Sequence, residues 1–480
     1  MERFYVTVAI PYVNSKPHVG YLYELVCGDV LARWHGLKGE DVFFLAGTDE
    51  NATKNAQAAK ELGIPTRKFV DQNSKLFDDL TKAYNISNTN FIRTIDPKHI
   101  KIAQEIYTKA YEKGDIYKGY YEGYYCQGCE AFLTDKDLVS GKCPEHKTEP
   151  KWLKEENYFF KMSKYKDRIL KLLANNFVVP DEKRREVYTR AKEGLSDFSV
   201  SRYKQEWGID VPFDKDHKIY VWYDALLCYI SGIDYPNEKF KKYWPADVQI
   251  IGKGINWFHS VIWSAILMSA ELPLPKKIAV HGYLTSEGEK MSKSLGNVLD
   301  PIELALDYGV DQIRYYLLRE IPFGQDGDFS TKKLKDRVNG ELVKELGNLV
   351  SRSLKLTEKV KGKIEGKAEL KIDLKQINKY MDKFELHHAL NEIFIFIKHV
   401  NKYINDTEPW KLDGKELSNA VYNLCESLRI IAILLHPFIP NTSDKILNQL
   451  GVKLGSLNDC IFKKFEGKPK LGGHLFELIQ

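Results

Sequence analysis

Hydrophobic residues follow two alternating patterns through the first hundred positions. Short apolar runs at residues 4–10 and 41–46 are typical of buried strands, and longer periodic runs at 22–35 and 55–62 are typical of helices. Strands that alternate with helices in this way predict βαβ units and a parallel sheet. The pattern resumes later, with strand-like runs at 219–223 and 248–251 and a helix-like run at 258–270.

The middle and the end of the chain have different patterns. From about Gly114 the sequence is rich in tyrosine, glycine, cysteine and lysine, which predicts a small inserted module, and after Phe329 the pattern is wholly helical. The lysine-rich residues 359–371 predict a solvated linker, with RNA binding as the less favoured alternative. Two apolar sets recur with the helical period and each share one face: Leu386, Leu390, Ile393, Phe394, Ile397, Val400 and Ile404, then Leu417, Val421, Leu424, Leu428, Ile431 and Leu435.

Composition and charge narrow the class of protein. A chain of 480 residues is long enough for about three domains, and its net charge of +5 permits a nucleic-acid partner without requiring one. The N-terminus lacks the pattern of a signal peptide, and the apolar stretches end well short of the roughly 20 residues that a membrane span needs. Seven cysteines, an odd number, indicate free thiols in a reducing compartment. We therefore expect a cytosolic protein without a membrane span.

Four potential metal ligands occur in two closely spaced pairs. Cys126 and Cys129 are separated by two residues, and so are Cys143 and His146 after an interval of 13 residues. Three thiols and an imidazole with no open position suit a tetrahedral, structural Zn²⁺. We expect one such site, and we expect the remaining cysteines to be buried free thiols: Cys27, Cys228, Cys425 and Cys460.

Two turn-like segments 272 positions apart suit the binding of a nucleotide triphosphate. The first, PHVGY at residues 17–21, precedes a helix-like run, and a helix N-terminus offers unpaired N–H groups to phosphate. The second, KMSKS at residues 290–294, brings Lys290 and Lys293 on a glycine- and serine-flanked loop. A second KMSK at residues 161–164 lacks this lead-in and is expected to be structural. In this order, the first two segments resemble the signature pair of class I aminoacyl-tRNA synthetases.

Further segments extend the resemblance over nearly the whole chain. They are IPY at 10–12, GTDE at 47–50, YVWYDALLCY at 220–229, the GK-I--FH pattern at 252–259, LGNLVSR at 346–352 and PW at 409–410. With them the chain resembles the methionyl-tRNA synthetases. The resemblance implies a Rossmann-type, parallel-sheet α/β catalytic domain at 1–115 and 211–330, carrying the KMSKS loop. It also implies an inserted connective module with a zinc knuckle at 116–210 and an α-helical anticodon-binding bundle at 331–480.

The resemblance also implies site residues. Methionine would be bound by Ile10, Tyr12, Asp49, Trp222, Tyr229, Ile255 and His259. ATP, with Mg²⁺, would be bound by Pro11, His18, Gly20, Tyr21, Lys290, Ser292 and Lys293, of which His18, Lys290 and Lys293 would act in catalysis. The anticodon would be bound by Asn348, Arg352, Pro409 and Trp410. From the residues alone, the alternatives are plain core packing for Trp222, Tyr229 and Trp410 and a turn or cap role for Asp49.

Three departures from the family pattern are expected to affect the ATP side of the site. The second histidine of the first signature is Tyr21, the His-Gly after GTDE is Asn51-Ala52, and the aspartate of the GKDI segment is Gly254. Tyr21 can donate a hydrogen bond but carries no charge. Gly254 removes a carboxylate that suits the ribose or the methionine ammonium group.

The expected activity is formation of methionyl-adenylate from methionine and ATP, followed by transfer to the terminal adenosine of tRNA(Met). A monomer without a membrane partner is expected. Two alternatives stay open: a class I synthetase for another amino acid such as leucine or cysteine, and a catalytically silent paralogue that binds tRNA.

Overall fold

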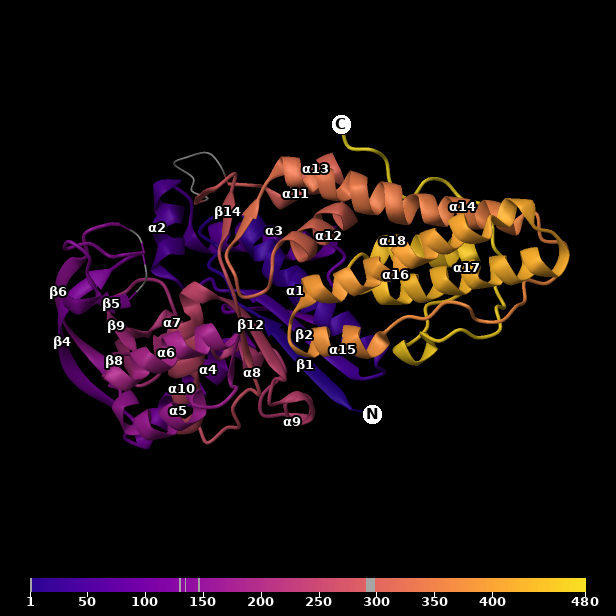
Figure 1. The fold of residues 1–480 in the computed structure, drawn as a ribbon. Helices are drawn as coiled ribbons and strands as arrows, with labels where there is room; N and C mark the ends of the chain where they lie inside the picture. The colour runs from indigo at the N-terminus through magenta and orange to yellow at the C-terminus, as the bar shows by residue number, and fades with distance from the viewer. Residues whose placement is uncertain (1, 129–130, 134, 146, 291–297) are drawn as a thin grey trace.

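A six-stranded parallel sheet forms the centre of the α/β part of the molecule. The computed structural model describes residues 2–128, 131–133, 135–145, 147–290 and 298–480. The strand order is β3-β2-β1-β12-β13-β7. Figure 1 labels β1, β2 and β12 at the centre of the molecule. The bounds are β1 (Arg3–Val8), β2 (Asp41–Thr48), β3 (Asn90–Arg93), β7 (Val178–Val179), β12 (Val248–Gly252) and β13 (Ile278–His281). The order reverses between β1 and β12, where such sheets bind ligands at the carboxyl ends of their strands.

Helices cover both faces of this sheet, which explains why its strands are apolar almost throughout. On β1, Phe4, Val6 and Val8 belong to one buried cluster, and Tyr5 points into the other. The helices of this part are α1 (Val19–Leu37), α2 (Thr53–Glu61), α3 (Thr66–Ala83), α4 (Pro97–Glu112), α7 (Val221–Ala225), α8 (Cys228–Ser231), α9 (Glu238–Tyr243), a π-helical turn at Phe258–Trp263 and α10 (Ser264–Ser269). The predicted alternation of strands and helices at 4–62 is confirmed.

The strand predicted at residues 219–223 is wrong. The chain leaves β11 (Asp214–Ile219) and enters helix α7 after Tyr220. Tyr220, Val221 and Tyr223 are all buried, so this short run is apolar on every side. Periodicity cannot distinguish a strand from a helix in such a run.

The inserted region is built on an antiparallel sheet of order β5-β4-β6-β8. Its strands are β4 (Ile116–Cys126), β5 (Ala131–Leu133), β6 (Lys151–Phe160) and β8 (Phe198–Ser199), followed by a small sheet of β9 (Ser201–Tyr203), β10 (Asp210–Val211) and β11. Helices α5 (Lys166–Leu173) and α6 (Asp181–Glu193) flank β7, which returns to pair with β13 at the edge of the central sheet. The first KMSK copy is structural: Lys164 Nζ lies 2.5 Å from Asp115 Oδ1, and Ser163 Oγ donates to Asp197.

A second small sheet ends at Lys290, the first residue of the KMSKS segment. It has the order β15-β14-β16, with β14 (Leu284–Ser286), β15 (Glu289–Lys290) and β16 (Gly327–Phe329). Helices α11 (Pro301–Tyr308) and α12 (Val310–Glu320) follow the loop and pack beside α1 and α3. Gly282 lies where a Cβ atom would meet the backbone oxygen of Gln325 at 2.1 Å, so this crossing of the chain requires glycine.

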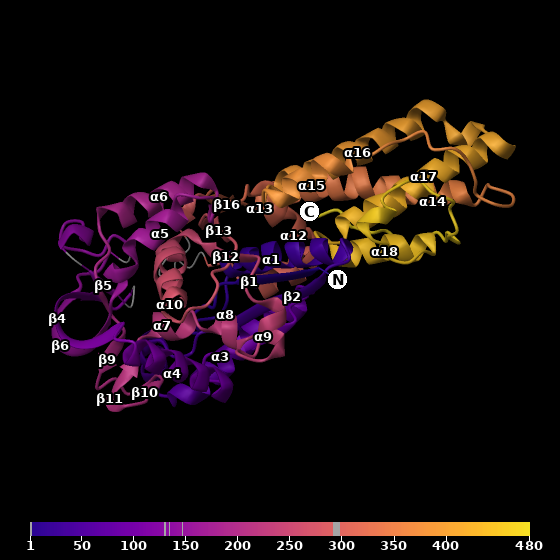
Figure 2. The same ribbon diagram turned by 90° about the horizontal axis from the view of Figure 1, so that it is seen from below.

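The C-terminal part is all helical, as predicted. Its elements are α13 (Thr331–Arg337), a π-helical stretch at Val338–Gly347, α14 (Asn348–Thr357), α15 (Leu374–Asp382), α16 (Leu386–Thr407), α17 (Gly414–Leu435) and α18 (Pro440–Leu450). Every residue of the two predicted apolar faces, on α16 and α17, is buried. Figures 1 and 2 show this bundle and the inserted module on opposite sides of the central sheet.

The predicted linker at 359–371 is an ordered strap on α17. Its backbone N–H groups at Glu365, Lys367 and Glu369 donate to the side chains of Ser418, Asn419 and Asn423. The lysines of the strap are exposed, so the prediction of a solvated charge run holds for its side chains and not for its backbone. In the part of the chain that the structure describes, no helix is long and apolar enough to cross a membrane.

A buried arginine joins the α/β part to the helical bundle. Arg314 of α12 and Asp29 of α1 are both fully buried, and Arg314 Nη2 lies 2.6 Å from Asp29 Oδ2. The same guanidinium donates to the backbone oxygens of Tyr84, Pro437 and Phe438. Asp29 lies on α1, and Arg314 also binds the backbone of the bundle, so the pair connects α1 to the bundle. The other end of α1 faces the switch point of the sheet.

Candidate active site and RNA-binding surface

The predicted methionine residues meet at the carboxyl ends of β1, β2 and β12. Ile10 and Tyr12 follow β1, Asp49 follows β2, and Ile255 and His259 follow β12. Tyr12 and Asp49 form a parallel bridge, and the Asp49 N–H donates to the Pro11 oxygen at 2.8 Å. The structure thus brings side chains from distant parts of the sequence to the point where the strand order reverses.

Hydrogen bonds fix one tautomer of the His259 ring. The Tyr229 hydroxyl lies 2.7 Å from His259 Nε2, and His259 Nδ1 lies 3.1 Å from the Ile255 oxygen. Since a carbonyl only accepts, Nδ1 carries the proton and Nε2 accepts from Tyr229. Burial lowers the pKa of His259 to about 4, so the ring is neutral at pH 7. The pair presents a neutral, polarizable surface inside the site.

Aromatic rings pack beside the His259 ring. Trp222 stacks on Phe258 with the ring centroids 3.8 Å apart, and it meets His259 edge to face at 6.3 Å. Tyr12 meets Trp222 edge to face, with the ring centroids 6.2 Å apart. Among the described residues, the buried Trp222 Nε1 has no hydrogen-bond partner. Sequence reasoning missed Phe258, because an aromatic residue in an apolar helix carries no signal beyond packing.

Asp49 is a buried carboxylate with only 1% of its surface exposed. Its Oδ1 accepts from the Asn51 N–H at 3.0 Å, and its backbone oxygen accepts from Asn55. A carboxylate in this position suits an ammonium group, because an ion pair is strongest where water is excluded.

The side chains of Asn51 and Ala52 turn into the core, and their effect on the ATP side stays a prediction. Asn51 Nδ2 donates to Asp224 Oδ2 at 2.7 Å, and Asp224 Oδ1 lies 2.5 Å from His99 Nε2, all inside the core. Ala52 is fully buried and packs with Tyr220 in a cluster beside Tyr12 and Trp222. The loop after β2 turns inward, which no local pattern reveals, so both departures support the segment that carries Trp222.

His18 is the N-cap of helix α1. Its Nδ1 accepts from the Gly20 N–H at 3.0 Å, so the proton of the neutral ring lies on Nε2. Protein atoms around the ring lower the pKa of His18 by desolvation, although the side chain reaches solvent. A Cβ atom at Gly20 would lie 2.8 Å from His18 Cε1, so glycine leaves room for the ring. The Val19 N–H donates to the Leu299 oxygen at 3.3 Å and the Tyr21 N–H to the His18 oxygen at 3.0 Å. The expectation of unpaired N–H groups at the start of this helix is therefore wrong, and His18 Nε2–H is the candidate donor for phosphate.

Tyr21 lies in the first turn of α1, and Glu24 lies about one turn further along it. Tyr21 packs on Phe77 with the ring centroids 5.2 Å apart, and its buried hydroxyl has no hydrogen-bond partner among the described residues. Glu24 accepts from the Ala9 N–H at 2.5 Å and lies 2.9 Å from His281 Nε2. This Glu24–His281 pair joins the ends of β1 and β13. Its only signal in the sequence is an acidic residue in an apolar helix.

Several predicted residues fall partly or wholly outside the described part of the chain. Ser292 and Lys293 lie outside it, as do Cys129 and His146, and only the backbone of Lys290 is described, in β15. Cys126 and Cys143 are described, and each is 1% exposed. Within the described ranges, no group of three or more His, Cys, Asp or Glu side chains is placed to hold a metal ion.

Comparison with known proteins gives the family. A model described as "tRNA synthetases class I (M)" matches residues 4–151 and 146–354. A methionine–tRNA ligase of Caldanaerobacter subterraneus is 47% identical over 94% of this chain and 74% of its own length. The chain belongs to the methionyl-tRNA synthetases. A second ligase of this family, from Brucella suis, is 43% identical over 94% of this chain and 92% of its own length.

Solved methionyl-tRNA synthetases share the whole fold. The Mycobacterium tuberculosis enzyme in complex with methionyl-adenylate is 39% identical, covers 99% of this chain and all of its own, and has a TM-score of 0.94. The free form of that enzyme has a TM-score of 0.87. A model described as the anticodon-binding domain of tRNA ligases matches residues 338–474, which include α14 and α16–α18.

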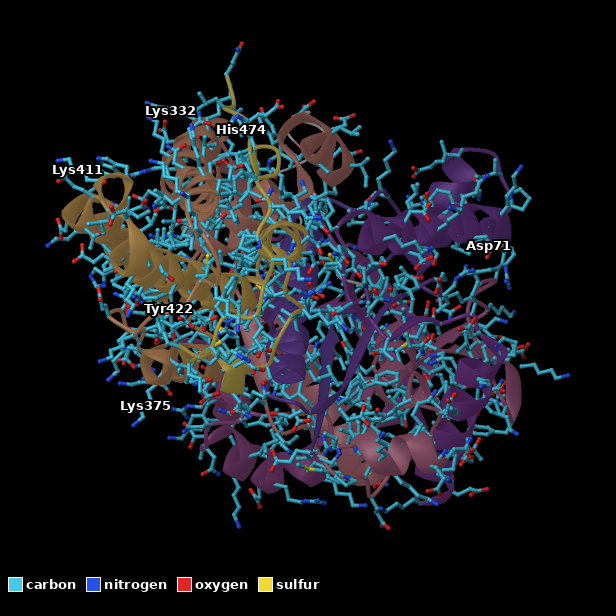
Figure 3. The ribbon with its side chains drawn as sticks, turned by 90° about the vertical axis from the view of Figure 1, so that its right-hand side faces the viewer. Asp71, Lys332, Lys375, Lys411, Tyr422 and His474 are labelled. Carbon is cyan, nitrogen blue, oxygen red and sulfur yellow. The ribbon has the colours of Figure 1, made fainter. Side chains whose placement is uncertain are left out.

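The predicted anticodon residues lie in the helical bundle, on α14 and between α16 and α17. Asn348 and Arg352 are exposed on α14, and Arg352 Nη2 donates to Asn405 Oδ1 of α16 at 2.9 Å. Trp410 is 44% exposed, whereas Pro409 before it is buried. The alternative of Trp410 as a core anchor is therefore wrong. Figure 3 looks at this side of the molecule and shows the neighbouring Lys411 pointing outward.

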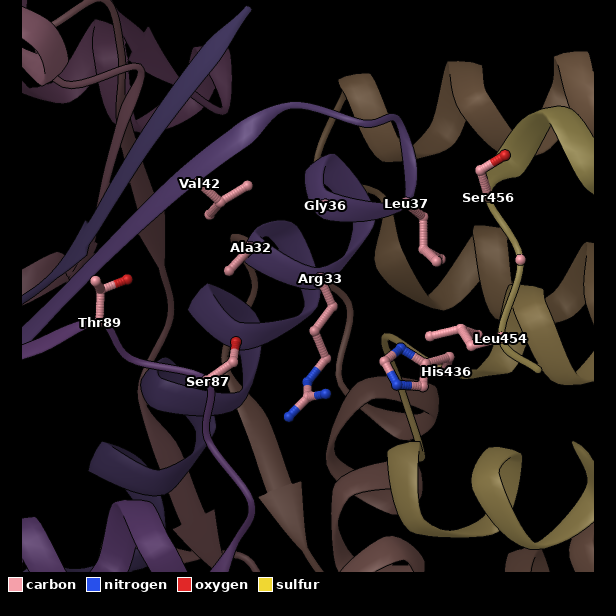
Figure 4. A pocket seen from close by; sticks show the side chains of 11 residues that line it. Ala32, Arg33, Gly36, Leu37, Val42, Ser87, Thr89, His436, Leu454 and Ser456 are labelled. Atoms are coloured by element: carbon pink, nitrogen blue, oxygen red, sulfur yellow. The ribbon is translucent and has the colours of Figure 1, made fainter. Parts of the chain in front are cut away.

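A separate cavity of about 460 Å³ lies where the α/β part meets the bundle (Figure 4). It is lined by Arg33, Leu37 and Val42 on one side and by His436 and Leu454 on the other. These residues surround the C-terminal end of α1, whose 19 residues span roughly 28 Å from His18 at 1.5 Å per residue. The cavity is thus distinct from the candidate active site.

Proposed function

We propose that this chain activates methionine with ATP and transfers it to the 3′-terminal adenosine of tRNA(Met). The observation that carries the proposal is the neutral Tyr229–His259 pair facing Trp222 at the switch point of the sheet. A thioether is apolar and polarizable, so it suits aromatic walls and a neutral imidazole better than a charged one. Ile10, Tyr12 and Ile255 complete the pocket, and Asp49 binds the ammonium group.

The first step joins the methionine carboxylate to the α-phosphate of ATP, and pyrophosphate leaves. Negative charge increases around the α-phosphate as the bonds change, so fixed donors there stabilise the transition state. We assign this donor role to His18 Nε2–H. Pro11, Gly20 and Tyr21 are proposed to line the ATP site beside it. Lys290, Ser292 and Lys293 are proposed to bind the phosphates as well. ATP is used as its Mg²⁺ complex.

In the second step a ribose hydroxyl of the terminal adenosine attacks the activated carbonyl, and AMP leaves. The anticodon is read at the far end of the bundle by Asn348, Arg352 and Trp410, with Pro409 holding the tryptophan in place. Exposed aromatic rings of this kind stack on single-stranded bases, and a nearby arginine adds edge contacts.

One structural Zn²⁺ in the inserted module is also part of the proposal. The fit rests on Cys126 and Cys143, which are buried in a thin antiparallel module, and on a donor set of three thiols and one imidazole. Cys126, Cys129, Cys143 and His146 would hold the ion, which would stabilise the fold of the module. Replacing Cys126 with serine should lower the bound zinc, measured by elemental analysis of the purified protein.

The domain division belongs to the same proposal: 1–115 and 211–330 as the catalytic domain, 116–210 as the connective module and 331–480 as the anticodon domain. The monomeric state and the cytosolic location stay predictions from the sequence.

The experiment is amino-acid-dependent exchange of pyrophosphate into ATP, followed by charging of tRNA(Met). Exchange should require methionine and be at least a hundredfold slower with leucine or cysteine. A preference for either of these would favour a synthetase for another amino acid. Binding of tRNA without any exchange would favour the silent paralogue. Replacing Lys293 with alanine should slow adenylate formation by orders of magnitude while the thermal unfolding temperature is unchanged.

A further inference from the structure

Position 254 is a glycine with a polar pair in the place of its missing side chain. β12 ends at Gly252, and Gly254 lies in the turn that leads to Ile255 of the methionine pocket. A Cβ atom built at Gly254 would lie 2.2 Å from the Tyr283 hydroxyl oxygen and 3.6 Å from Glu145 Oε1. The carboxylate that the family pattern has at this position is absent from the turn, but another carboxylate, that of Glu145, lies beside the same point.

Tyr283 and Glu145 come from different parts of the chain and are held together. The Tyr283 hydroxyl donates to Glu145 Oε1 at 2.9 Å. Tyr283 precedes β14, at the root of the KMSKS loop, and its N–H donates to Asp326 Oδ1 at 2.8 Å. Lys253 Nζ lies 4.6 Å from the centre of the tyrosine ring and 2.6 Å from Asp326 Oδ2. The ring is thus fixed over Gly254 from three sides, and it fixes Glu145 of the inserted module in turn.

The location of this pair indicates the part of the substrate that it meets. Ile255 and His259, directly after Gly254, belong to the methionine pocket, whereas Tyr283 leads into the loop with the phosphate-binding lysines. The group of ATP that is attached to the α-phosphate, beside the methionine carboxylate, is the ribose. Carboxylates at the switch point of such sheets accept hydrogen bonds from ribose hydroxyls, and a phenol hydroxyl can both donate and accept.

We propose that Glu145 and Tyr283 bind the ribose hydroxyls of ATP, so that the inserted module supplies the carboxylate that position 254 lacks. This inference rests on the proposed function. It makes the module a part of the nucleotide site, because Glu145 lies between the predicted zinc ligands Cys143 and His146.

The test compares ATP with 2′-deoxy-ATP and 3′-deoxy-ATP in methionine-dependent exchange. The wild type should prefer ATP to at least one of the two analogues by about tenfold in kcat/KM. Replacing Glu145 with alanine should lower kcat/KM for ATP by about tenfold and abolish that preference, while the KM for methionine changes less than twofold. Glu149→Ala, an exposed acid of the same module, is the matched control and should behave as the wild type.

A second variant tests the same contact by a change at position 254, in the turn after β12. In Gly254→Ala the new methyl group displaces the Tyr283 hydroxyl, so the preference for ATP should fall as it does in Glu145→Ala. Gly36→Ala is its control, since no atom lies within 4 Å of a Cβ there.

The inference is overturned if the wild type uses ATP and both analogues equally well. It is also overturned if Glu145→Ala keeps the wild-type preference for ATP over the deoxy analogues. The same holds if the loss of kcat/KM caused by the variant and the loss caused by the missing hydroxyl multiply when the two are combined. Absence of exchange in the wild type itself would instead refute the proposed function. The two failures are therefore distinguishable.

Discussion

His18 has two roles that substitution can separate. Its Nδ1 caps helix α1 through the Gly20 N–H at 3.0 Å, and its Nε2–H is left for the substrate phosphates. Alanine removes both roles, whereas asparagine keeps the cap, because its side-chain oxygen is an equally good acceptor at this position. Loss of an N-cap costs about 1 kcal/mol of stability. Loss of one donor to a transition-state oxyanion costs a factor of about 10²–10³ in rate.

We therefore expect His18→Ala and His18→Asn to lose about the same activity and to differ in stability. In pyrophosphate exchange, both should lower kcat by about 10²–10³. In urea unfolding, His18→Ala should lose about 1 kcal/mol and His18→Asn only a few tenths. Activity of His18→Asn within threefold of the wild type would refute the catalytic role of Nε2, because only the cap would then matter.

Gly20→Ala provides a matched pair for this reasoning. The new methyl group would lie 2.8 Å from His18 Cε1 and force the ring to move, whereas Gly36→Ala, in the same helix, meets nothing within 4 Å. Both changes add helix propensity, by about 1 kcal/mol at most. Only Gly20→Ala should reduce exchange. Equal activity of the two variants would show that the position of the ring does not matter.

Three further predictions concern other parts of the molecule. Trp410→Ala should lower kcat/KM for tRNA charging at least fivefold, since stacking is worth about 1–3 kcal/mol per base. It should leave pyrophosphate exchange unchanged. Ile461 is also exposed on the bundle, and Ile461→Ala should change neither activity. For His259, the folded pKa of about 4 lies below the unfolded 6.5, so the unfolded state binds more protons between them and stability falls as the pH falls through this range. Between pH 7 and pH 5, His259 should therefore lower the free energy of unfolding by about 2 kcal/mol. This decrease should be absent when His259→Asn is unfolded in urea at the same two pH values. Arg314→Leu should lower the free energy of unfolding by about 3 kcal/mol, because Asp29 stays buried, and adding Asp29→Asn should recover part of that loss; strictly additive losses would contradict this.

The sequence predicted the parts of the fold that depend on local pattern. Apolar strands alternating with helices gave the parallel sheet, and the apolar faces of α16 and α17 were predicted residue by residue. The failure at 219–223 has a physical cause, since Tyr220 and Val221 are buried on all sides and carry no period.

The candidate site divides in the same way. Residues such as Tyr12, Trp222 and His259 could be named because they stand in recognisable segments. Contacts between distant segments left no such signal: the Asn51 amide on Asp224, Glu24 on His281, and Tyr283 on Glu145. Each depends on which way a loop turns after its strand. That direction is set by tertiary packing and not by local sequence.

The central claim is that the pocket around Tyr229, His259 and Trp222 selects methionine for adenylate formation. Its most direct test is to incubate the purified protein with MgATP, pyrophosphatase and one amino acid, and to identify the bound adenylate by mass spectrometry. With methionine we predict methionyl-adenylate at close to one equivalent per chain, and with leucine or cysteine almost none. Absence of the adenylate with methionine, or its formation from leucine to the same extent, would contradict the account.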